Sequence, residues 1–375
     1  MKYRKCGNLD FEVSALGFGA MRLPIIDDDS GQINQDEAVK MIRYSIDHGV
    51  NYVDTAWPYH SGESELVVGS ALQDGYREKV KLATKMPSWE VKERADLDRL
   101  LDKQLEKLQT DHIDFYLLHA LNREHWENYK KVDVFSWIEK VKEEGKVVNI
   151  GFSFHADYDL FEEIIDAYNW DFCQIQYNYL DTEFQAGKKG LKYAADKGIA
   201  VVIMEPLRGG KLAQDPPAEV KEILDESNFD HTLADWALQW LWNQPEVAVV
   251  LSGMSTMEQV KENIESADKS DVSSLSQKEL DIIEEIKEKF RGPIGCTSCE
   301  YCMPCPTGVD IPGNFAIYNE AHLYDNFAEK QKEYNEMDAE KKASACVRCG
   351  QCEPLCPQNL EIMDLLEKVA VYFEN

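Results

Sequence analysis

The sequence has no long apolar run and is poor in positive charge. No stretch approaches the roughly 20 consecutive apolar residues of a membrane-spanning helix, and the start, MKYRKCGNLDFEVS, lacks the apolar core of a signal peptide. Across 375 residues, 40 Lys and Arg face 69 Asp and Glu, a formal net charge of −29. Such a surplus repels phosphate backbones and anionic lipid headgroups. We therefore expect a cytoplasmic protein that binds neither nucleic acid nor membrane.

Cysteine is scarce over most of the chain. Only Cys6 and Cys173 precede residue 296, and the other eight of the ten cysteines lie between Cys296 and Cys356. Clustering of this kind in a cytoplasmic chain favours metal binding over a disulfide framework. The two separate cysteines are expected to be small, buried apolar side chains.

Short apolar runs alternate with longer segments of helical periodicity up to about residue 290, which indicates a parallel sheet with crossover helices. Eight strand-helix units over about 285 residues predict a closed (β/α)8 TIM barrel. An open doubly wound sheet would need a Gly-rich phosphate turn, which LGFGAM matches only weakly. The eight runs are residues 14–19, 51–56, 80–85, 113–119, 147–153, 172–178, 199–206 and 247–253.

Two more helices are expected after the eighth run, over residues 255–268 and 274–290, and RGPIG then breaks the helical pattern. We place the domain boundary at this break. Residues 1–289 are expected to form the barrel, and residues 290–375 a small, mainly helical iron-sulfur domain for the reasons given below.

Polar residues end three consecutive predicted strands. Asp54, Lys85 and His119 stand at these ends, and Tyr59 lies in the loop just past Asp54. Each alone is more often structural than functional. Consecutive strands of a (β/α)8 barrel are neighbours, and its chemistry takes place at their carboxyl ends, so the four side chains can converge. Together they can transfer a proton, since an ammonium beside a phenol lowers the phenol's pKa and a carboxylate holds the ammonium.

The barrel region resembles the aldo/keto reductase family through DTAWPYHSGESELVVG, LATK, DFYLLH, GFSFH, CQIQYN and MSTMEQVKEN, which occur in this order. The resemblance implies an NAD(P)-dependent oxidoreductase that reduces a small carbonyl compound to an alcohol or oxidises the alcohol. Tyr59 would be the general acid, Lys85 would tune it, Asp54 would pair with Lys85, and His119 would orient the carbonyl. A preorganised donor suits an alkoxide that develops in a water-poor pocket.

The same resemblance implies the cofactor contacts. Gly253 and Gln259 stand where a Lys and an Arg would bind a 2′-phosphate in the family, and Met204 stands where an aromatic ring often stacks on the nicotinamide. NADP and NAD therefore both stay open as the cofactor. Glycines in the pyrophosphate loop would allow a close backbone approach. The implied contacts are Gly19, Ala20 and Met21 after the first strand, Ser153 and Gln174 near the carboxamide, Met204 at the nicotinamide, Glu205, Pro206, Leu207, Gly209 and Lys211 in the pyrophosphate loop, Gly253 and Gln259 at the 2′-phosphate position, and Glu262 and Asn263 near the adenine.

Two cysteine runs follow the barrel region. The second run matches the C-x2-C-x2-C-x3-C-P pattern of bacterial ferredoxins, in which the fourth cysteine serves the other cluster, and the first run is one residue shorter before its last cysteine. Zinc is the alternative, although its cysteine ligands usually come as two C-x-x-C pairs. The resemblance to a ferredoxin-type domain implies two [4Fe-4S] clusters. One would be held by Cys296, Cys299, Cys302 and Cys356, and the other by Cys346, Cys349, Cys352 and Cys305.

Two functions are compatible with these patterns. The first is an aldo/keto reductase-type oxidoreductase whose clusters exchange electrons with a redox partner protein. The second is an electron-transfer or interaction module whose barrel binds nucleotide but is catalytically weak. Cluster binding also supplies folding energy, so a structural role of the clusters stays open as well.

Overall fold

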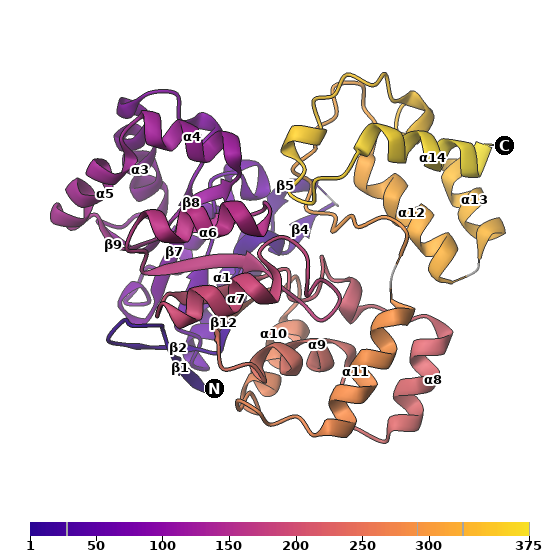
Figure 1. Cartoon of the computed structure of the whole chain (residues 1–375), viewed down its shortest axis with the longest axis horizontal. Coiled ribbons are helices and arrows are strands. Elements are labelled where there is room, and N and C mark those ends of the chain that lie inside the picture. The colour runs from indigo at the N-terminus through magenta and orange to yellow at the C-terminus, as the bar shows by residue number, and fades with distance from the viewer. Residues whose placement is uncertain (28, 291, 325, 375) are drawn as a thin grey trace. The chain divides into compact units, whose positions relative to one another are not determined.

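The computed structural model describes residues 1–27, 29–290, 292–324 and 326–374, with only the backbone described at positions 30 and 288. The chain forms two compact units, each made of two segments (Figure 1). The first unit consists of Met1–Pro206 and Ala237–Leu275, and the second of Leu207–Trp236 and Ser276–Asn375.

The first unit contains a closed barrel of eight parallel strands, whose order around the barrel follows the chain. Each of the eight apolar runs in the sequence overlaps one of these strands, so the predicted (β/α)8 barrel is confirmed. The strands are β3 (Leu16–Gly19), β6 (Tyr52–Asp54), β7 (Lys81–Met86), β8 (Ile113–Leu121), β9 (Val147–Phe154), β10 (Phe172–Gln176), β11 (Ala200–Met204) and β12 (Val247–Gly253).

Helices surround these strands, so most strand residues are buried, as the nearly continuous apolar runs require. Two short antiparallel pairs, β1 (Tyr3–Lys5) with β2 (Glu12–Ser14) and β4 (Ile25–Ile26) with β5 (Asp29–Ile33), precede the first helix. The helices of this unit are α1 (Gln35–Asp47), α2 (Ser64–Ala71), α3 (Arg94–Leu108), α4 (Arg123–Lys131), α5 (Val134–Glu143), α6 (Tyr158–Ala167), α7 (Gly187–Asp196) and α10 (Met257–Ala267).

An aromatic cluster fills the barrel near the starts of its strands. The ring centroid of Phe115 lies 5.1 Å from that of Tyr52 and 4.7 Å from that of Phe172. Cys6 belongs to the same buried cluster, and Cys173 is also fully buried. The strand starts are therefore closed by apolar packing, and polar side chains are concentrated at the opposite strand ends.

The second unit is mainly helical, and no β-strand occurs among its described residues. An apolar core that includes Phe315, Leu366 and Phe373 packs against six of the eight clustered cysteines. Helices α8 and α11 lie side by side (Figure 1). The helices are α8 (Ala218–Ser227), α11 (Gln277–Lys289), α12 (Ile311–Leu323), α13 (Phe327–Glu336) and α14 (Ile362–Glu374), and α9 (Leu233–Trp242) begins in this unit and ends in the first.

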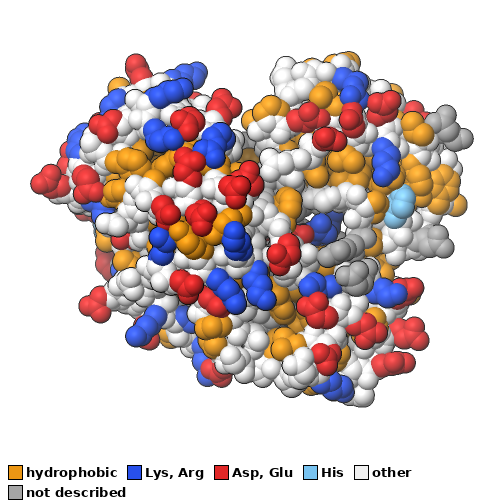
Figure 2. Space-filling view, in the orientation of Figure 1, with side chains coloured by type: hydrophobic (Ala, Val, Ile, Leu, Met, Phe, Trp, Pro, Cys, Tyr) orange, Lys and Arg blue, Asp and Glu red, His pale blue; other side chains and the backbone are white. Residues whose placement is uncertain are grey.

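Charged side chains of both signs cover the surface. Figure 2 shows Asp and Glu side chains spread over the visible face and interspersed with Lys and Arg. Many of the ion pairs on the surface are exposed, and such pairs contribute little stability individually. In the part of the chain that the structure describes, no helix has the length and apolar character needed to cross a membrane.

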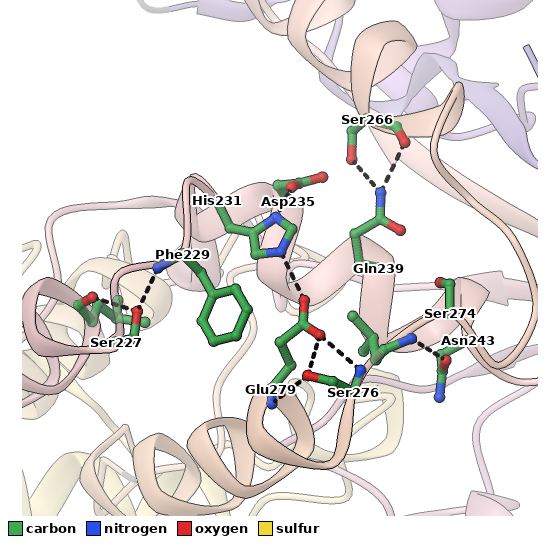
Figure 3. A network of polar contacts seen from close by, with 12 residues as sticks. Ser227, Phe229, His231, Asp235, Gln239, Asn243, Ser266, Ser274, Ser276 and Glu279 are labelled. Atoms are coloured by element: carbon green, nitrogen blue, oxygen red, sulfur yellow. Dashed lines mark hydrogen bonds and ion pairs between the residues drawn. The ribbon is translucent and has the colours of Figure 1, made fainter.

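His231 links the start of α9 to the start of α11 (Figure 3). Its Nδ1 contacts the carboxylate of Asp235, and its Nε2 lies 3.1 Å from Oε1 of Glu279. Glu279 also accepts a hydrogen bond from the backbone N–H of Ser276 at 2.7 Å, which completes the capping box of α11. The hydrogen bond to Asp235, opposed by burial and assisted by Glu279, raises the pKa of His231 above 6.5.

The protonated form of His231 should stabilise this part of the fold. Because its pKa is raised in the folded state, this contribution is complete below about pH 6.5 and is lost as the pH rises through the raised value. We expect His231→Gln to lower the thermal unfolding temperature near pH 5.5, with the gap to wild type closing toward pH 9. Anaerobic melting curves at both pH values measure the gap, and an unchanged gap would contradict the prediction.

Candidate functional site

The four residues predicted to be catalytic lie together at the carboxyl ends of β6, β7 and β8. The ammonium Nζ of Lys85 donates hydrogen bonds to Oδ1 of Asp54 at 2.6 Å and to the carbonyl oxygen of Thr55 at 2.8 Å. It also lies 3.3 Å from the hydroxyl oxygen of Tyr59. The ring centroids of Tyr59 and His119 are 6.3 Å apart. The ammonium thus lies between the carboxylate and the phenol. This order allows the carboxylate to hold the ammonium and the ammonium to lower the pKa of the phenol.

Burial controls the charges in this group. Lys85 is 0% exposed and Asp54 2% exposed, whereas Tyr59 is only half-buried. Burial lowers the pKa of Lys85 and raises that of Asp54, and the short contact between the two groups opposes both shifts. The pair is held as an ion pair because each charge is the other's main compensation.

His119 is neutral in this setting. Burial, followed by the charge of Lys85 and by the neighbouring His155 and His125, lowers its pKa well below 6.5. Its ring lies 5.2 Å, between centroids, from that of Trp89. A neutral imidazole can donate a hydrogen bond without adding a second positive charge beside Lys85. The site therefore combines one fixed cation with one neutral donor.

The segment that carries Tyr59 is held by contacts to other strand ends. His60 and Ser61 adopt left-handed backbone conformations, with φ of 52° and 55°. Nε2 of His60 accepts a hydrogen bond from the backbone N–H of Leu23 at 3.0 Å, and the hydroxyls of Thr55 and Ser64 lie 2.8 Å apart. These contacts fix the turn between β6 and α2, so the phenol stays beside Lys85.

Several residues predicted to contact the cofactor lie on barrel strands or directly after one. Gly19 is paired with Asp54 on β6, and Ala20 and Met21 follow it in a 3-10 turn. Gln174 is opposite Ser153 on the neighbouring strand. The expected positions around the catalytic group are therefore brought together within the barrel.

Gln174 supplies a specific test of fit to a nicotinamide cofactor. It is buried, and its Nε2 donates to Sδ of Met204 at 3.5 Å. Its Oε1 has no hydrogen-bond partner among the described residues. A buried acceptor without a donor is costly, and the N–H groups of a carboxamide would satisfy it. The residues present fit this part of the cofactor.

The residues predicted to lie near the adenosine differ in their hydrogen bonds to the rest of the protein. Nδ2 of Asn263 donates to Oγ of Ser252 at 3.0 Å, and Oε1 of Gln259 accepts from the backbone N–H of Ser255 at 2.8 Å. Glu262 is half-buried on α10. Gly253 is exposed, and a Cβ at this position would lie 3.2 Å from side-chain carbons of Arg22. Neither Gly253 nor Gln259 offers a positive charge.

The predicted pyrophosphate loop is divided between the two units. Glu205 and Pro206 belong to the first unit, whereas Leu207, Gly209 and Lys211 belong to the second. Within the second unit, Nζ of Lys211 donates a hydrogen bond to the carbonyl oxygen of Cys296 at 3.2 Å. This loop is thus attached to the beginning of the first cysteine run, a contact that the sequence did not indicate.

The cysteines of the second unit gather in the predicted combinations for one site. A cavity lined by three cysteines of the first run is completed by the last cysteine of the second run, and Pro312 and Ile362 form part of its wall. Cys305, Cys346 and Cys352 pack against the same apolar core, and Cys349 is exposed. Among the described residues, no three side chains of His, Cys, Asp or Glu are placed so that they could hold one metal ion together. The cysteines lining the cavity are Cys296, Cys299, Cys302 and Cys356.

The backbone of the two runs suits anionic sulfur. Ser298 and Glu300 in the first run, and Arg348 and Gly350 at the equivalent places in the second, all have positive φ. Such alternation makes concavities of backbone N–H groups that bind anions, including iron-sulfur clusters. The N–H of Ser298 lies 3.4 Å from Sγ of Cys296. Both runs are therefore shaped alike, as two cluster-binding loops would be.

The two cysteines that precede proline share a further feature. Burial raises the pKa of Cys356, and hydrogen bonds from three backbone N–H groups, two to four residues later, oppose this. For Cys305, the hydroxyl of Thr307 and three equivalent backbone N–H groups outweigh burial and lower the pKa of the thiol. These donors stabilise thiolates, which is the form that binds iron.

Three polar residues near Lys85 were not predicted from the sequence. Glu65, Gln104 and Lys107 form a polar network behind the catalytic group, in contact with Thr84 on β7. The sequence carried one signal, because the acidic Glu65 directly precedes the apolar residues of the stretch ELVVG. A carboxylate amid buried positions of a helix needs partners, and these are now identified.

Comparison with known proteins agrees with both units. The model of the aldo/keto reductase family matches residues 15–288, and that of a 4Fe-4S dicluster domain matches residues 295–361. An uncharacterized oxidoreductase of Bacillus subtilis is 27% identical over 298 residues, covering 71% of this chain and 91% of that protein. An NADH-specific methylglyoxal reductase of Escherichia coli is 25% identical, covering 70% of this chain and 93% of that protein.

Solved structures show the same relationship. An aldo-keto reductase from Bacillus halodurans, in its holo form, is 27% identical with a TM-score of 0.64, covering 76% of this chain and 96% of that chain. An aldo/keto reductase from Klebsiella pneumoniae in complex with NADP and acetate shares the fold at 24% identity, with a TM-score of 0.62 and coverage of 76% and 95%.

The buried ion pair predicts a large effect of one substitution. Asp54→Asn keeps the shape of the side chain but leaves the charge of Lys85 buried without its carboxylate, which should cost about 3–5 kcal/mol of stability. We expect denaturant unfolding of the barrel, followed by tryptophan fluorescence, to show this loss. Adding Lys85→Met should recover part of it, because no uncompensated charge is left. A wild-type unfolding midpoint for Asp54→Asn would contradict the prediction.

Proposed function

Since the chain belongs to the aldo/keto reductase family and is an NAD(P)-dependent oxidoreductase with a C-terminal 4Fe-4S domain, we propose that it reduces a small carbonyl compound to an alcohol with Tyr59 as the general acid. The observation that carries this proposal is the contact of 3.3 Å between Nζ of Lys85 and the hydroxyl oxygen of Tyr59, with Asp54 on the other side of the ammonium. No other role accounts as directly for a fully buried lysine at this place.

When bound, a nicotinamide nucleotide would supply a hydride to the carbonyl carbon, and Ser153 and Gln174 would hold its carboxamide. As negative charge develops on the carbonyl oxygen, the hydroxyl of Tyr59 donates its proton there, and the ammonium of Lys85 stabilises the phenolate that is left. Asp54 holds Lys85 as an ammonium. The neutral imidazole of His119 donates a second hydrogen bond to the same oxygen and so orients the carbonyl.

The nucleotide itself is NADH or NADPH. Gly253 and Gln259 provide no cation for a 2′-phosphate, which supports NADH, and one similar enzyme of Escherichia coli is NADH-specific. The similar structure from Klebsiella pneumoniae contains NADP, which supports the alternative. Activity assays with each nucleotide, on a panel of aldehydes and ketones, separate the two.

Removing the phenolic proton should abolish most of the activity. Tyr59→Phe keeps the ring but cannot protonate the alkoxide, so we expect kcat to fall by roughly 10²- to 10⁴-fold, with nucleotide affinity preserved. Tyr76→Phe, which removes a hydroxyl bonded to Asp47 at 2.9 Å on the surface, is the matched control and should keep wild-type kcat. NAD(P)H oxidation is the readout, and full activity in Tyr59→Phe would overturn the assignment.

We also propose that the second unit binds two [4Fe-4S] clusters and exchanges electrons with a redox partner protein. The exposed position of Cys349 supports this, together with Val347 and Leu355, which are 65% and 54% exposed beside the second run. Bound clusters would accept and release single electrons. An exposed second run also favours the alternative function, an electron-transfer module whose barrel turns over little carbonyl.

The exchanged fourth ligand can be tested by substitution. Although Cys356 belongs to the second run, Cys356→Ser should perturb the same cluster as Cys302→Ser, because both side chains line one cavity. We expect the electron paramagnetic resonance spectra of these two reduced variants to lose the same signal, and Cys346→Ser to lose the other. Cys173→Ala, outside both runs, should keep full iron content. A shared loss between Cys356→Ser and Cys346→Ser would contradict the exchange.

A further inference from the structure

Glu65 is a fully buried carboxylate that the reaction scheme does not use. It lies on α2, and its Oε1 accepts hydrogen bonds from Oγ1 of Thr84 at 2.8 Å and from Nε2 of Gln104 at 2.6 Å. Its Oε2 is 3.4 Å from Nζ of Lys107. A carboxylate buried this completely is retained only where several donors compensate its charge.

The contacts of Glu65 indicate that it is ionised. All three neighbouring groups can donate a hydrogen bond to it, and two of the donors, the NH2 group of Gln104 and the ammonium of Lys107, cannot accept one. Burial raises the pKa of Glu65, while Gln104, Thr84 and Lys107 oppose that shift. The network therefore places a second negative charge close to the catalytic lysine.

The network reaches Lys85 through its own strand. Nε2 of Gln104 also donates to the carbonyl oxygen of Lys85 at 3.0 Å, and its Oε1 accepts from the hydroxyl of Tyr116 at 2.6 Å. Thr84 directly precedes Lys85 on β7. The charge of Glu65, together with that of Asp54, favours the ammonium form of Lys85 against the effect of burial.

The same network reaches the segment that carries Tyr59. Nζ of Lys107 donates to the carbonyl oxygen of Gly62 at 3.1 Å and lies 4.2 Å from the ring centroid of Trp57. These two residues flank Tyr59 on either side in the sequence. Glu65 thus contacts, through Lys107, both ends of the turn that presents the phenol.

We propose that Glu65 is a positioning residue for the reaction, which keeps Lys85 charged beside Tyr59 and, through Lys107, fixes the turn from Trp57 to Gly62. The inference rests on the proposed role of Tyr59 as the proton donor. The buried carboxylates of Glu65 and Asp54 thereby balance the charges of the buried Lys85 and the partly exposed Lys107.

The groups that face Lys85 determine the expected pH dependence. Those on neighbouring elements are Asp54, Tyr59, Glu65, His119 and His155. The pKa of His119 is lowered well below 6.5 and that of His155 to about 4, so both are neutral above pH 6.5. In the neutral to alkaline range, the charges of Asp54 and Glu65 therefore oppose the lowering of the pKa of Lys85 by burial.

Glu65→Gln removes one of these charges while keeping the size and an oxygen acceptor. Lys85 should then lose its proton at a lower pH, so the alkaline limb of the kcat profile should move down by roughly one pH unit. KM for the nucleotide should stay at the wild-type value, because Glu65 touches no cofactor position. Glu106→Gln, which removes an exposed carboxylate next to Lys107 on α3, is the matched control and should keep the wild-type profile.

A stability measurement tests the same inference without turnover. In Glu65→Gln the folded protein should release the proton of Lys85 at a lower pH, while the unfolded chain keeps its proton up to about pH 10.5. The unfolded state then binds more protons, so the stability deficit of the variant should shrink as the pH rises toward 10. Adding Lys85→Met to both proteins should abolish this change.

The two measurements separate the inference from the proposed function. If wild type and Tyr59→Phe turn over carbonyls equally, the proposed function fails, and the stability deficit still decides the role of Glu65. A deficit that is the same at neutral and alkaline pH would overturn the inference. A wild-type kcat profile in Glu65→Gln would also overturn it, even in an active enzyme.

Discussion

The burial of one ammonium group governs the organisation of the barrel end. A charge that is removed from water requires compensation on every side, and Lys85 obtains it from Asp54, from the carbonyl oxygen of Thr55 and from the phenol of Tyr59. Each partner comes from the strand or turn next to β7. The arrangement proposed for catalysis is thus also the arrangement that makes the buried lysine tolerable, so the stability of the fold and the proposed reactivity depend on the same contacts.

Parallel strands in register make this compensation possible. Asp54 pairs with Ala83, two residues before Lys85, and Lys85 pairs with Leu117, two residues before His119. Because side chains alternate along a strand, residues two apart point to the same side. The tilt of the barrel therefore brings Asp54, Lys85 and His119 to one place. Left-handed backbone conformations occur in the turn at His60 and Ser61 and at Ala120, directly after His119.

Sequence patterns predicted the strands and the catalytic group because both depend on short-range regularities. Apolar runs marked all eight strands, and the polar residues that end three of them converge as barrel geometry requires. The network of Glu65, Gln104 and Lys107 was not predictable in this way. Its members lie on two helices, and the pairing of their side chains depends on how those helices pack. One acidic residue next to an apolar stretch shows that a partner is needed, but not which residue supplies it.

The position of Lys211 illustrates a second limit. The family resemblance implied a contact with the pyrophosphate, which stays a prediction, and within the second unit Lys211 donates to the carbonyl oxygen of Cys296. A loop of small and charged residues has no periodicity, so the sequence does not tell which surface it packs on. The cysteine spacing, in contrast, is a local pattern. Cys356 and the first three cysteines, which it assigns to one cluster, line one cavity, and their role as ligands stays a prediction.

The two units handle charge in opposite ways, and this difference suits two kinds of chemistry. In the barrel, side-chain ions are buried in neutralising pairs, which leaves a water-poor site where a hydride and a proton can be delivered to one bond. In the second unit, backbone N–H groups surround the thiols, and one cysteine of the second run is exposed. Single electrons pass between proteins at exposed centres, whereas hydride transfer needs exclusion of water. A chain that combined hydride transfer with electron exchange would need these two environments in separate parts, and the two units of this chain provide them.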